Sequence, residues 1–223
     1  PDGTRIVTAG ADGTVRVWDP VSGEQLSELS GHLGQVNAAA YSADGKFIVT
    51  AGADGTARTW DARTGAELQQ FKGHLGQVNA AAYSPAGKTI VTGGADGSVR
   101  IWDAVSGEQL RELRRHTGAV AAVAYSPDGT TIATAGQDQT ARVWDAATGG
   151  ELWERIAHGG PVYAAAFSPD GKSILTGGQD NLARMWDAAT GMPLPQRNGH
   201  TDAITAAAYS PDGGSILTAG ADG

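Results

Sequence analysis

The sequence predicts an all-β protein built from a repeated unit of four short antiparallel strands. Tryptophan recurs every 42 residues, at Trp18, Trp60, Trp102, Trp144 and Trp186. Histidine recurs with the same period, at His32, His74, His116, His158 and His200. A fixed period of this length is typical of proteins in which each repeat folds as one supersecondary unit. The 223 residues make five periods and 13 further residues, which align with the first 13.

Four short segments make up one period. Residues 36–41 end at a Ser-x-x-Gly turn, 47–51 at Asp54-Gly55 and 56–61 near Thr64-Gly65, and residues 67–71 lead to Gly73-His74. Short runs separated by such turns predict antiparallel strands joined by hairpins. The alanine triplets at 38–40 and 80–82 favour a helix when considered alone. The spacing between turn signals is too short for a helix, so we predict strands there too.

Composition and charge exclude several classes of protein. The 33 glycines do not recur at every third position, which excludes a collagen-like chain. With no cysteine there is no disulfide framework, thiol nucleophile or cysteine-ligated metal. A net charge of −8 with scattered lysine and arginine argues against a nucleic-acid partner. No apolar run approaches the roughly 20 residues that span a bilayer, so we expect no membrane partner either.

The strongest motif is the Trp-Asp pair, which recurs at 18–19, 60–61, 102–103, 144–145 and 186–187. Gly-His pairs stand at three of the five expected sites, and Asp-Gly pairs separate the strands. Together these motifs resemble the WD-repeat (WD40) β-propeller family over the whole chain. The resemblance implies four-stranded blades arranged radially, and near-identical blades are typical of its bacterial members.

The resemblance also implies how the chain divides. We expect a single propeller domain, with a partial blade at 1–31, full repeats at 32–73, 74–115, 116–157 and 158–199, and a partial blade at 200–223. The chain thus holds 5.3 repeats of 42 residues. A family-typical ring of seven blades would need about 70 residues more, so the expected fold is an incomplete seven-bladed ring.

In the resembled family each blade carries a hydrogen-bonded set of tryptophan, threonine or serine, histidine and aspartate. Four complete sets are expected here: His32, Thr50, Asp54 and Trp60; His74, Thr92, Asp96 and Trp102; His116, Thr134, Asp138 and Trp144; and His158, Thr176, Asp180 and Trp186. An indole N–H only donates, a hydroxyl does both, and neutral imidazole donates on one nitrogen and accepts on the other. A repeated Thr/His/Asp catalytic triad is the alternative, but a hydroxyl held between tryptophan and histidine is poorly placed as a nucleophile. We therefore predict no catalytic residues, no metal and no cofactor.

Function on a repeated scaffold should reside where the repeats differ. In the resembled family, partners dock at the start of the innermost strand and before the turn aspartate. The corresponding candidates for a partner-binding face are Gln35, Asn37, Gln77, Asn79, Gln137, Tyr163, Gln179 and Thr205. Strand alternation around Val36 and its equivalents would place them on one face, opposite the packed side chains. This face is rich in amides and lacks charge, and Tyr163 is its aromatic candidate anchor.

Trp153 departs from the repeat. It stands where the other repeats have Ser27, Gln69 and Arg111, so we expect it to be exposed on an outer strand, with Pro193 and Pro195 in the next outer strand.

These observations favour a non-catalytic interaction scaffold or sensor, part of a larger multidomain signalling protein, with protein partners or an attached effector domain. A propeller that binds a small molecule or glycan is the alternative, and an enzyme that uses the propeller face is less favoured because convergent titratable groups outside the repeat are almost absent. A cytoplasmic location is expected, and the oligomeric state is open.

Overall fold

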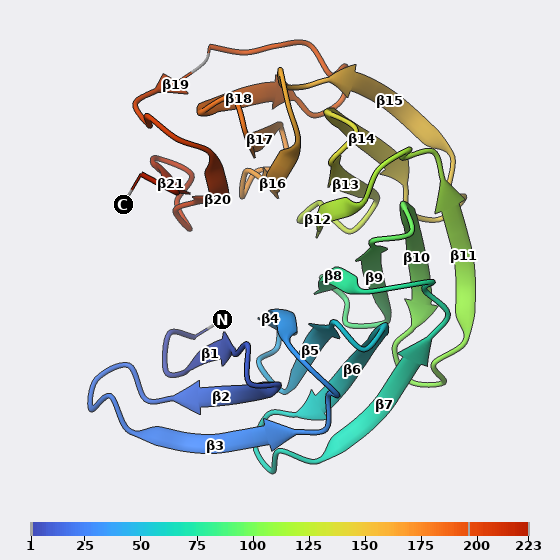
Figure 1. Ribbon diagram of the computed structural model, residues 1–223, viewed down its shortest axis with the longest axis vertical. Coiled ribbons are helices and arrows are strands. Elements are labelled where there is room, and N and C mark those ends of the chain that lie inside the picture. Colours follow the sequence, from blue (N-terminus) through green and yellow to red (C-terminus); the bar gives the residue numbers. More distant parts are fainter. Residues whose placement is uncertain (1, 196, 223) are drawn as a thin grey trace. The chain divides into compact units, whose positions relative to one another are not determined.

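The computed structural model describes residues 2–195 and 197–222, and all their regular secondary structure is β (Figure 1). The chain divides into two compact units, residues 1–113 and 114–223. None of the described residues belongs to a helix long and apolar enough to cross a membrane.

The first unit contains three antiparallel sheets, in which strands follow the order of the chain. The first sheet comprises β1 (Ile6–Ala9), β2 (Thr14–Trp18) and β3 (Gln25–Ser30); the second comprises β4 (Val36–Tyr41), β5 (Phe47–Gly52), β6 (Thr56–Asp61) and β7 (Glu67–Lys72); the third comprises β8 (Val78–Tyr83), β9 (Thr89–Gly94), β10 (Ser98–Asp103) and β11 (Gln109–Arg114). In Figure 1, β4 and β8 lie on the same side of this unit, and β3 and β7 lie on the opposite side.

The second unit repeats the arrangement. Its sheets comprise β12 (Val120–Tyr125), β13 (Thr131–Gly136), β14 (Thr140–Asp145) and β15 (Glu151–Ile156); β16 (Val162–Phe167), β17 (Ser173–Gly178), β18 (Leu182–Asp187) and β19 (Arg197–Asn198); and β20 (Ile204–Tyr209) and β21 (Ile216–Gly220). The predicted period of four antiparallel strands is confirmed, and the alanine triplets lie in strands β4 and β8. The four-stranded context therefore overrides the helix propensity of alanine.

The hydrophobic core of each unit lies between neighbouring sheets. Between the first two sheets, for example, Val15, Val17 and Leu29 pack with Ile48 and Trp60. The second strand of each four-stranded sheet is buried on both faces, as β5 shows. Each sheet thus needs a neighbour to cover its apolar face, which is the packing that a repeat protein requires.

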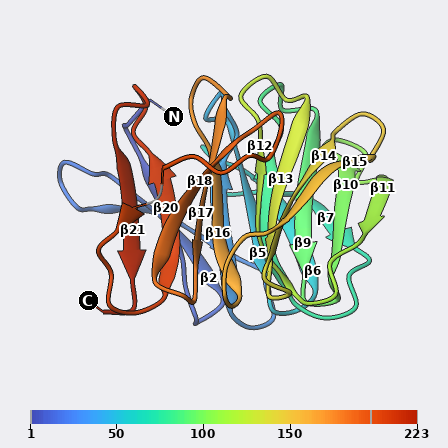
Figure 2. The same cartoon turned by 90° about the horizontal axis from the view of Figure 1, so that it is seen from above.

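Turns gather at two opposite edges of the sheets, as Figure 2 shows for the second unit. In each four-stranded sheet we call the first strand along the chain the innermost strand and the fourth the outer strand, as with β4 and β7. The edge where the innermost strand begins and the second strand ends is the entry edge; in the second sheet it holds residues 31–35 and 53–55. The other edge, where the innermost strand ends, is the exit edge; in the same sheet it holds residues 42–46 and 61–66.

The innermost strands are not regular. Asn37 is an extra residue in β4, because Val36 pairs with Gly52 whereas Ala38 pairs with the adjacent Ala51. The same register shift recurs in β8, β12, β16 and β20. A β-bulge of this kind redirects the side chain at the extra residue and interrupts the alternation of faces. The simple strand alternation on which the predicted face depends is therefore interrupted at Asn37.

The expectation that Trp153 is exposed was wrong. Its side chain is buried, and its indole N–H donates to the Ala188 carbonyl at 2.9 Å. Arg155 lies over the indole ring and donates to the Gly191 carbonyl at 2.9 Å. The two side chains therefore cover the turn of the neighbouring sheet. The alignment of Trp153 with polar residues in other repeats could not predict its burial, because the turn that covers it, which contains Ala188 and Gly191, belongs to the next repeat.

Two turns on the entry edge carry a side chain where other repeats have glycine. Gln139 and Asn181 have φ values of 69° and 66°, and the equivalent glycine Gly55 has 80°. A left-handed conformation costs a non-glycine residue about 1–2 kcal/mol, partly offset by the larger entropy that glycine loses on folding. Asparagine tolerates this conformation better than glutamine does.

Gln139→Gly is therefore expected to raise the free energy of unfolding by about 0.5 kcal/mol, measured by urea denaturation. Asn181→Gly is the matched control and should give a smaller gain. A loss of stability in Gln139→Gly would show that the glutamine side chain makes a stabilising interaction that outweighs its backbone strain.

Candidate functional site

The four predicted polar sets come together in the structure. In each, the histidine Nε2 lies 2.8 Å from the threonine hydroxyl oxygen. The tryptophan N–H donates to the same hydroxyl at 2.9–3.0 Å, and the histidine Nδ1 lies 2.7–3.1 Å from the aspartate. Each set thus links four places in one blade. The tryptophan lies on the third strand, the threonine on the second strand, the histidine before the innermost strand and the aspartate in the turn between the second and third strands.

Hydrogen-bond chemistry determines which atoms donate and which accept within each set. The carboxylate of Asp96 only accepts, so Nδ1 of His74 donates to it, and Nε2 accepts from the Thr92 hydroxyl. Burial lowers the pKa of His74 more than the neighbouring Asp96 raises it, which keeps the imidazole neutral. All hydrogen-bonding capacity of the imidazole is then used inside the set. The four threonines are completely buried, at 0% exposure, so a substrate cannot reach their hydroxyl groups.

The turn aspartate also fixes the backbone of the entry edge. Asp54 accepts the backbone N–H of Leu33 at 3.0 Å, the N–H of Thr56 at 3.0 Å and the Thr56 hydroxyl at 2.7 Å. Burial alone would raise the pKa of Asp54, but these hydrogen bonds and the one from His32 bring the pKa down to about 2. The carboxylate stays ionised and holds two loops of one sheet together.

In three of these sets an arginine contacts a glutamate of the outer strand, and we did not predict these glutamate partners from the sequence. Arg58 lies 3.4 Å from Asp54 and 2.7 Å from Glu67 of the outer strand. Arg100 and Arg142 contact outer-strand glutamates in the same way. The recurrence of arginine two residues before each tryptophan was the available signal, but the glutamate partners vary in position along the outer strand. The repeated polar residues therefore connect all four strands of a blade.

The candidate partner-binding residues are placed differently. Gln35, Gln77, Gln137 and Gln179 are exposed on the entry edge, and Thr205 is also exposed. Asn37 is half-buried, and its side-chain amide donates to the Val78 carbonyl of the neighbouring sheet at 2.8 Å. Asn79 and Tyr163 are half-buried at the equivalent bulge position. The bulge thus directs Asn37 to its neighbour, and the glutamines carry the exposed amides.

Backbone pairing relates the four glutamines in a way that the sequence does not. The N–H of Ala53 donates to the Gln35 carbonyl, whereas the N–H of Gln137 donates to the Ala119 carbonyl. Gln77 pairs with Ala95, and Gln179 with Pro161. The repeat position of Gln35 and the repeat position of Gln137 are therefore joined by one backbone hydrogen bond in each of these sheets. Each four-stranded sheet has one glutamine in this pair, immediately before the innermost strand in the first unit and in the turn after the second strand in the second unit.

None of these four glutamine side chains makes a hydrogen bond within the described part of the chain. Each amide group therefore has an acceptor and two donors available. No lysine, arginine, aspartate or glutamate stands at the paired positions, so the recognition chemistry that they offer is neutral and polar. Such groups match the N–H and C=O groups of another polypeptide.

Comparison with known proteins assigns the family. The model of the WD40 family, described as "WD domain, G-beta repeat", matches residues 1–19, 23–61, 65–103, 107–145, 150–187 and 191–223. A comparison with curated proteins found no match. WD40 repeats generally serve as scaffolds for protein interactions and are typically not enzymes. Because six consecutive matches cover almost the whole chain and the four-stranded sheets carry the expected polar sets, this protein belongs to the WD40 repeat family.

Proposed function

We propose that this chain is a protein-interaction platform that binds extended polypeptide segments along the entry edge of its blades. The observation that carries the proposal is the exposed glutamine with an unpaired amide that every four-stranded blade holds at the paired positions of the entry edge. The shared histidine, threonine and aspartate groups are occupied inside the blades, which leaves recognition to the positions that vary. As part of a larger protein, the platform would present a partner to an attached effector domain.

Neutral amides favour a peptide over a phosphate-bearing or strongly charged ligand. A phosphate or an acidic peptide is usually bound by clustered arginine or lysine, and the glutamine positions have none. A glutamine amide can donate to a backbone carbonyl and accept from a backbone N–H, as a neighbouring strand does. Each unit offers two such glutamines on successive blades, which suits a segment long enough to contact both.

A peptide-display selection on the whole chain, followed by fluorescence anisotropy, tests the proposal. The selected peptides should be uncharged at their contact positions. Gln35→Ala/Gln77→Ala and Gln137→Ala/Gln179→Ala are each tested. Substitution of the pair that a peptide contacts should weaken its binding about tenfold, since two lost hydrogen bonds of about 0.7 kcal/mol each add to about 1.4 kcal/mol.

Gln25→Ala/Gln109→Ala is the matched control, because both residues are exposed glutamines on outer strands β3 and β11. The control should leave the affinity within about twofold of the unmodified chain. The proposal fails if the control weakens binding as much as the entry-edge pairs do, or if the selection yields no peptide that binds.

A further inference from the structure

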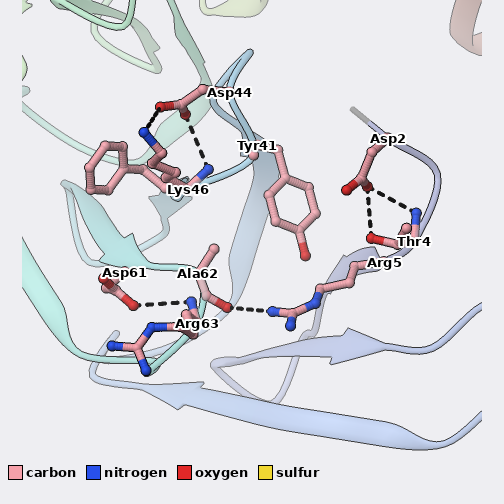
Figure 3. A pocket seen from close by; sticks show the side chains of 11 residues that line it. Asp2, Thr4, Arg5, Tyr41, Asp44, Lys46, Asp61, Ala62 and Arg63 are labelled. Atoms are coloured by element: carbon pink, nitrogen blue, oxygen red, sulfur yellow. Dashed lines mark hydrogen bonds and ion pairs between the residues drawn. The ribbon is translucent and has the colours of Figure 1, made fainter.

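We propose that a cavity on the exit edge, between the first and second sheets, binds a carboxylate with an apolar body. The cavity has a volume of about 490 Å³, within the range of small-molecule sites. Arg5, Tyr41, Lys46, Phe47, Ala62 and Arg63 are among its lining residues (Figure 3). This site lies on the opposite edge from the glutamines, and its ligand chemistry is independent of peptide binding.

The cavity repeats at other sheet junctions, which gives an internal comparison. The next junction of the first unit has a cavity of about 330 Å³ lined by Phe47, Tyr83 and Val105. A junction in the second unit has one of about 270 Å³ lined by Thr131, Asp170 and Ala189. Each of these residues has a counterpart in the first cavity at a multiple of 42 residues: Phe47 and Thr131 correspond to Arg5, Tyr83 to Tyr41, Asp170 to Asp44, and Val105 and Ala189 to Arg63. The first junction is therefore the largest of the three and the one with two arginines.

Neither arginine belongs to the repeat. The position of Arg5 is occupied in later repeats by Phe47, Thr89, Thr131, Ser173 and Ser215, and that of Arg63 in other repeats by Val21, Val105, Ala147 and Ala189. A residue that builds the blade would be expected in several copies. Two guanidinium groups introduced at one junction instead indicate a local function.

Two side chains in this cavity have hydrogen-bond donors without an acceptor among the described residues. Arg5 donates from Nη1 to the Ala62 carbonyl at 3.1 Å, and its other N–H groups have no acceptor among the described residues. The buried hydroxyl of Tyr41 has no hydrogen-bond partner there either. At the equivalent junction in the second unit, the Tyr209 hydroxyl lies 2.9 Å from Ser173, which stands at the repeat position of Arg5. Arg5 cannot accept a hydrogen bond as Ser173 can, so its position supplies no acceptor to Tyr41.

Figure 3 shows the Tyr41 hydroxyl pointing toward the Arg5 side chain. Burial raises the pKa of Tyr41, so its hydroxyl stays protonated and can donate. Two donors that face the same space need an acceptor with at least two lone pairs, which a carboxylate supplies. A buried donor without a partner is unfavourable, so an entering acceptor would relieve that penalty.

Three carboxylates also line the cavity, and they limit which anion it can bind. Asp2, Asp44 and Asp61 each accept a backbone N–H of their own turn, at 3.0, 3.1 and 2.7 Å. Aspartates recur at these turn positions in later repeats, so they belong to the blade. Their negative charge disfavours a phosphate dianion relative to a monovalent carboxylate. The rings of Tyr41 and Phe47 provide apolar surface for the rest of the ligand.

The probe is hippurate, a monovalent carboxylate with an aromatic body, and the matched neutral probe is hippuramide. Each is titrated into the whole chain and followed by ¹H–¹⁵N NMR. Hippurate should bind with a dissociation constant of about 1 mM and shift the amide signals of Ala62 and Arg63. Hippuramide and inorganic phosphate should bind at least about tenfold more weakly, because a charge-assisted hydrogen bond to arginine contributes more than a neutral one.

Arg5→Met and Arg63→Met should each weaken hippurate binding about tenfold, and Tyr41→Phe about threefold. Arg63 is an exposed turn residue, so its variant should fold even if Arg5→Met does not. Lys172→Met is the control: it removes an exposed cation at the repeat position of Lys46, in a junction without arginine, and should leave binding unchanged. Equal binding of hippuramide, tighter binding of phosphate, or shifts confined to other surfaces would each overturn the proposal.

Discussion

Replacing His74 with alanine is expected to lower the free energy of unfolding by about 3 kcal/mol. The side chain is only 2% exposed, and it bridges the Thr92 hydroxyl and the Asp96 carboxylate. Its removal leaves both groups buried without their partner, at about 1–3 kcal/mol for each stranded group, and opens a cavity beside Trp102. Urea denaturation followed by tryptophan fluorescence measures the loss.

His200→Ala is the matched control for this variant. His200 makes the same two contacts, to Thr218 at 2.9 Å and Asp222 at 2.8 Å, but its side chain is 25% exposed. Water can therefore replace the lost hydrogen bonds, and the expected loss is about 1 kcal/mol. Equal losses in the two variants would contradict the role of burial, and an unchanged His74→Ala variant would contradict the structural role of the set.

The second large effect is a loss of stability in acid. Burial lowers the pKa of His32, His74, His116 and His158 from the ordinary value of 6.5. Below pH 6.5 the unfolded chain therefore binds protons that the folded chain does not, so the free energy of unfolding falls as the pH falls. The turn aspartates act in the same direction at lower pH. Hydrogen bonds hold the pKa of Asp54 at about 2 against the opposing effect of burial, compared with 3.8 when unfolded.

We therefore expect stability to be greatest near neutral pH, to decline below pH 6.5, and to decline more steeply between pH 3.8 and about 2. The loss from Asp54 alone is roughly 2 kcal/mol at the acid end of this range. Urea titrations at a series of pH values, repeated in 1 M NaCl, measure the effect. Salt screens surface charges but not buried groups, so the decline should persist in salt. A free energy of unfolding that stays constant from pH 7 to pH 3 would contradict the account.

The repeat and the strands could be predicted from the sequence alone, and the polar sets from the resemblance to the WD40 family, because each depends on residues within one period. Trp102 and Thr92, for instance, occupy adjacent strands of a single hairpin, and Asp96 stands in the turn between them. The fixed period then confirmed each element several times within one chain.

What the sequence did not predict depends on contacts between strands or between repeats. The bulge at Asn37 arises from the register against β5, and its hydrogen bond to Val78 comes from the next sheet. The resemblance placed Gln35 and Ala53 on one docking face, but the backbone hydrogen bond between them comes from the structure. The exit-edge cavity likewise combines Arg5 of one repeat with Tyr41 of the next.

The central claim is that the shared polar residues hold each blade together, whereas recognition resides at positions that vary between blades. Measuring stability and peptide affinity on the same two variants tests it most directly. His74→Ala should lose about 3 kcal/mol of stability yet bind a selected peptide within about twofold of the unmodified chain wherever it remains folded. Gln35→Ala/Gln77→Ala should keep its stability within about 0.5 kcal/mol and bind a peptide selected at that pair about tenfold more weakly. A folded, equally stable His74→Ala variant that no longer binds the peptide would contradict the account.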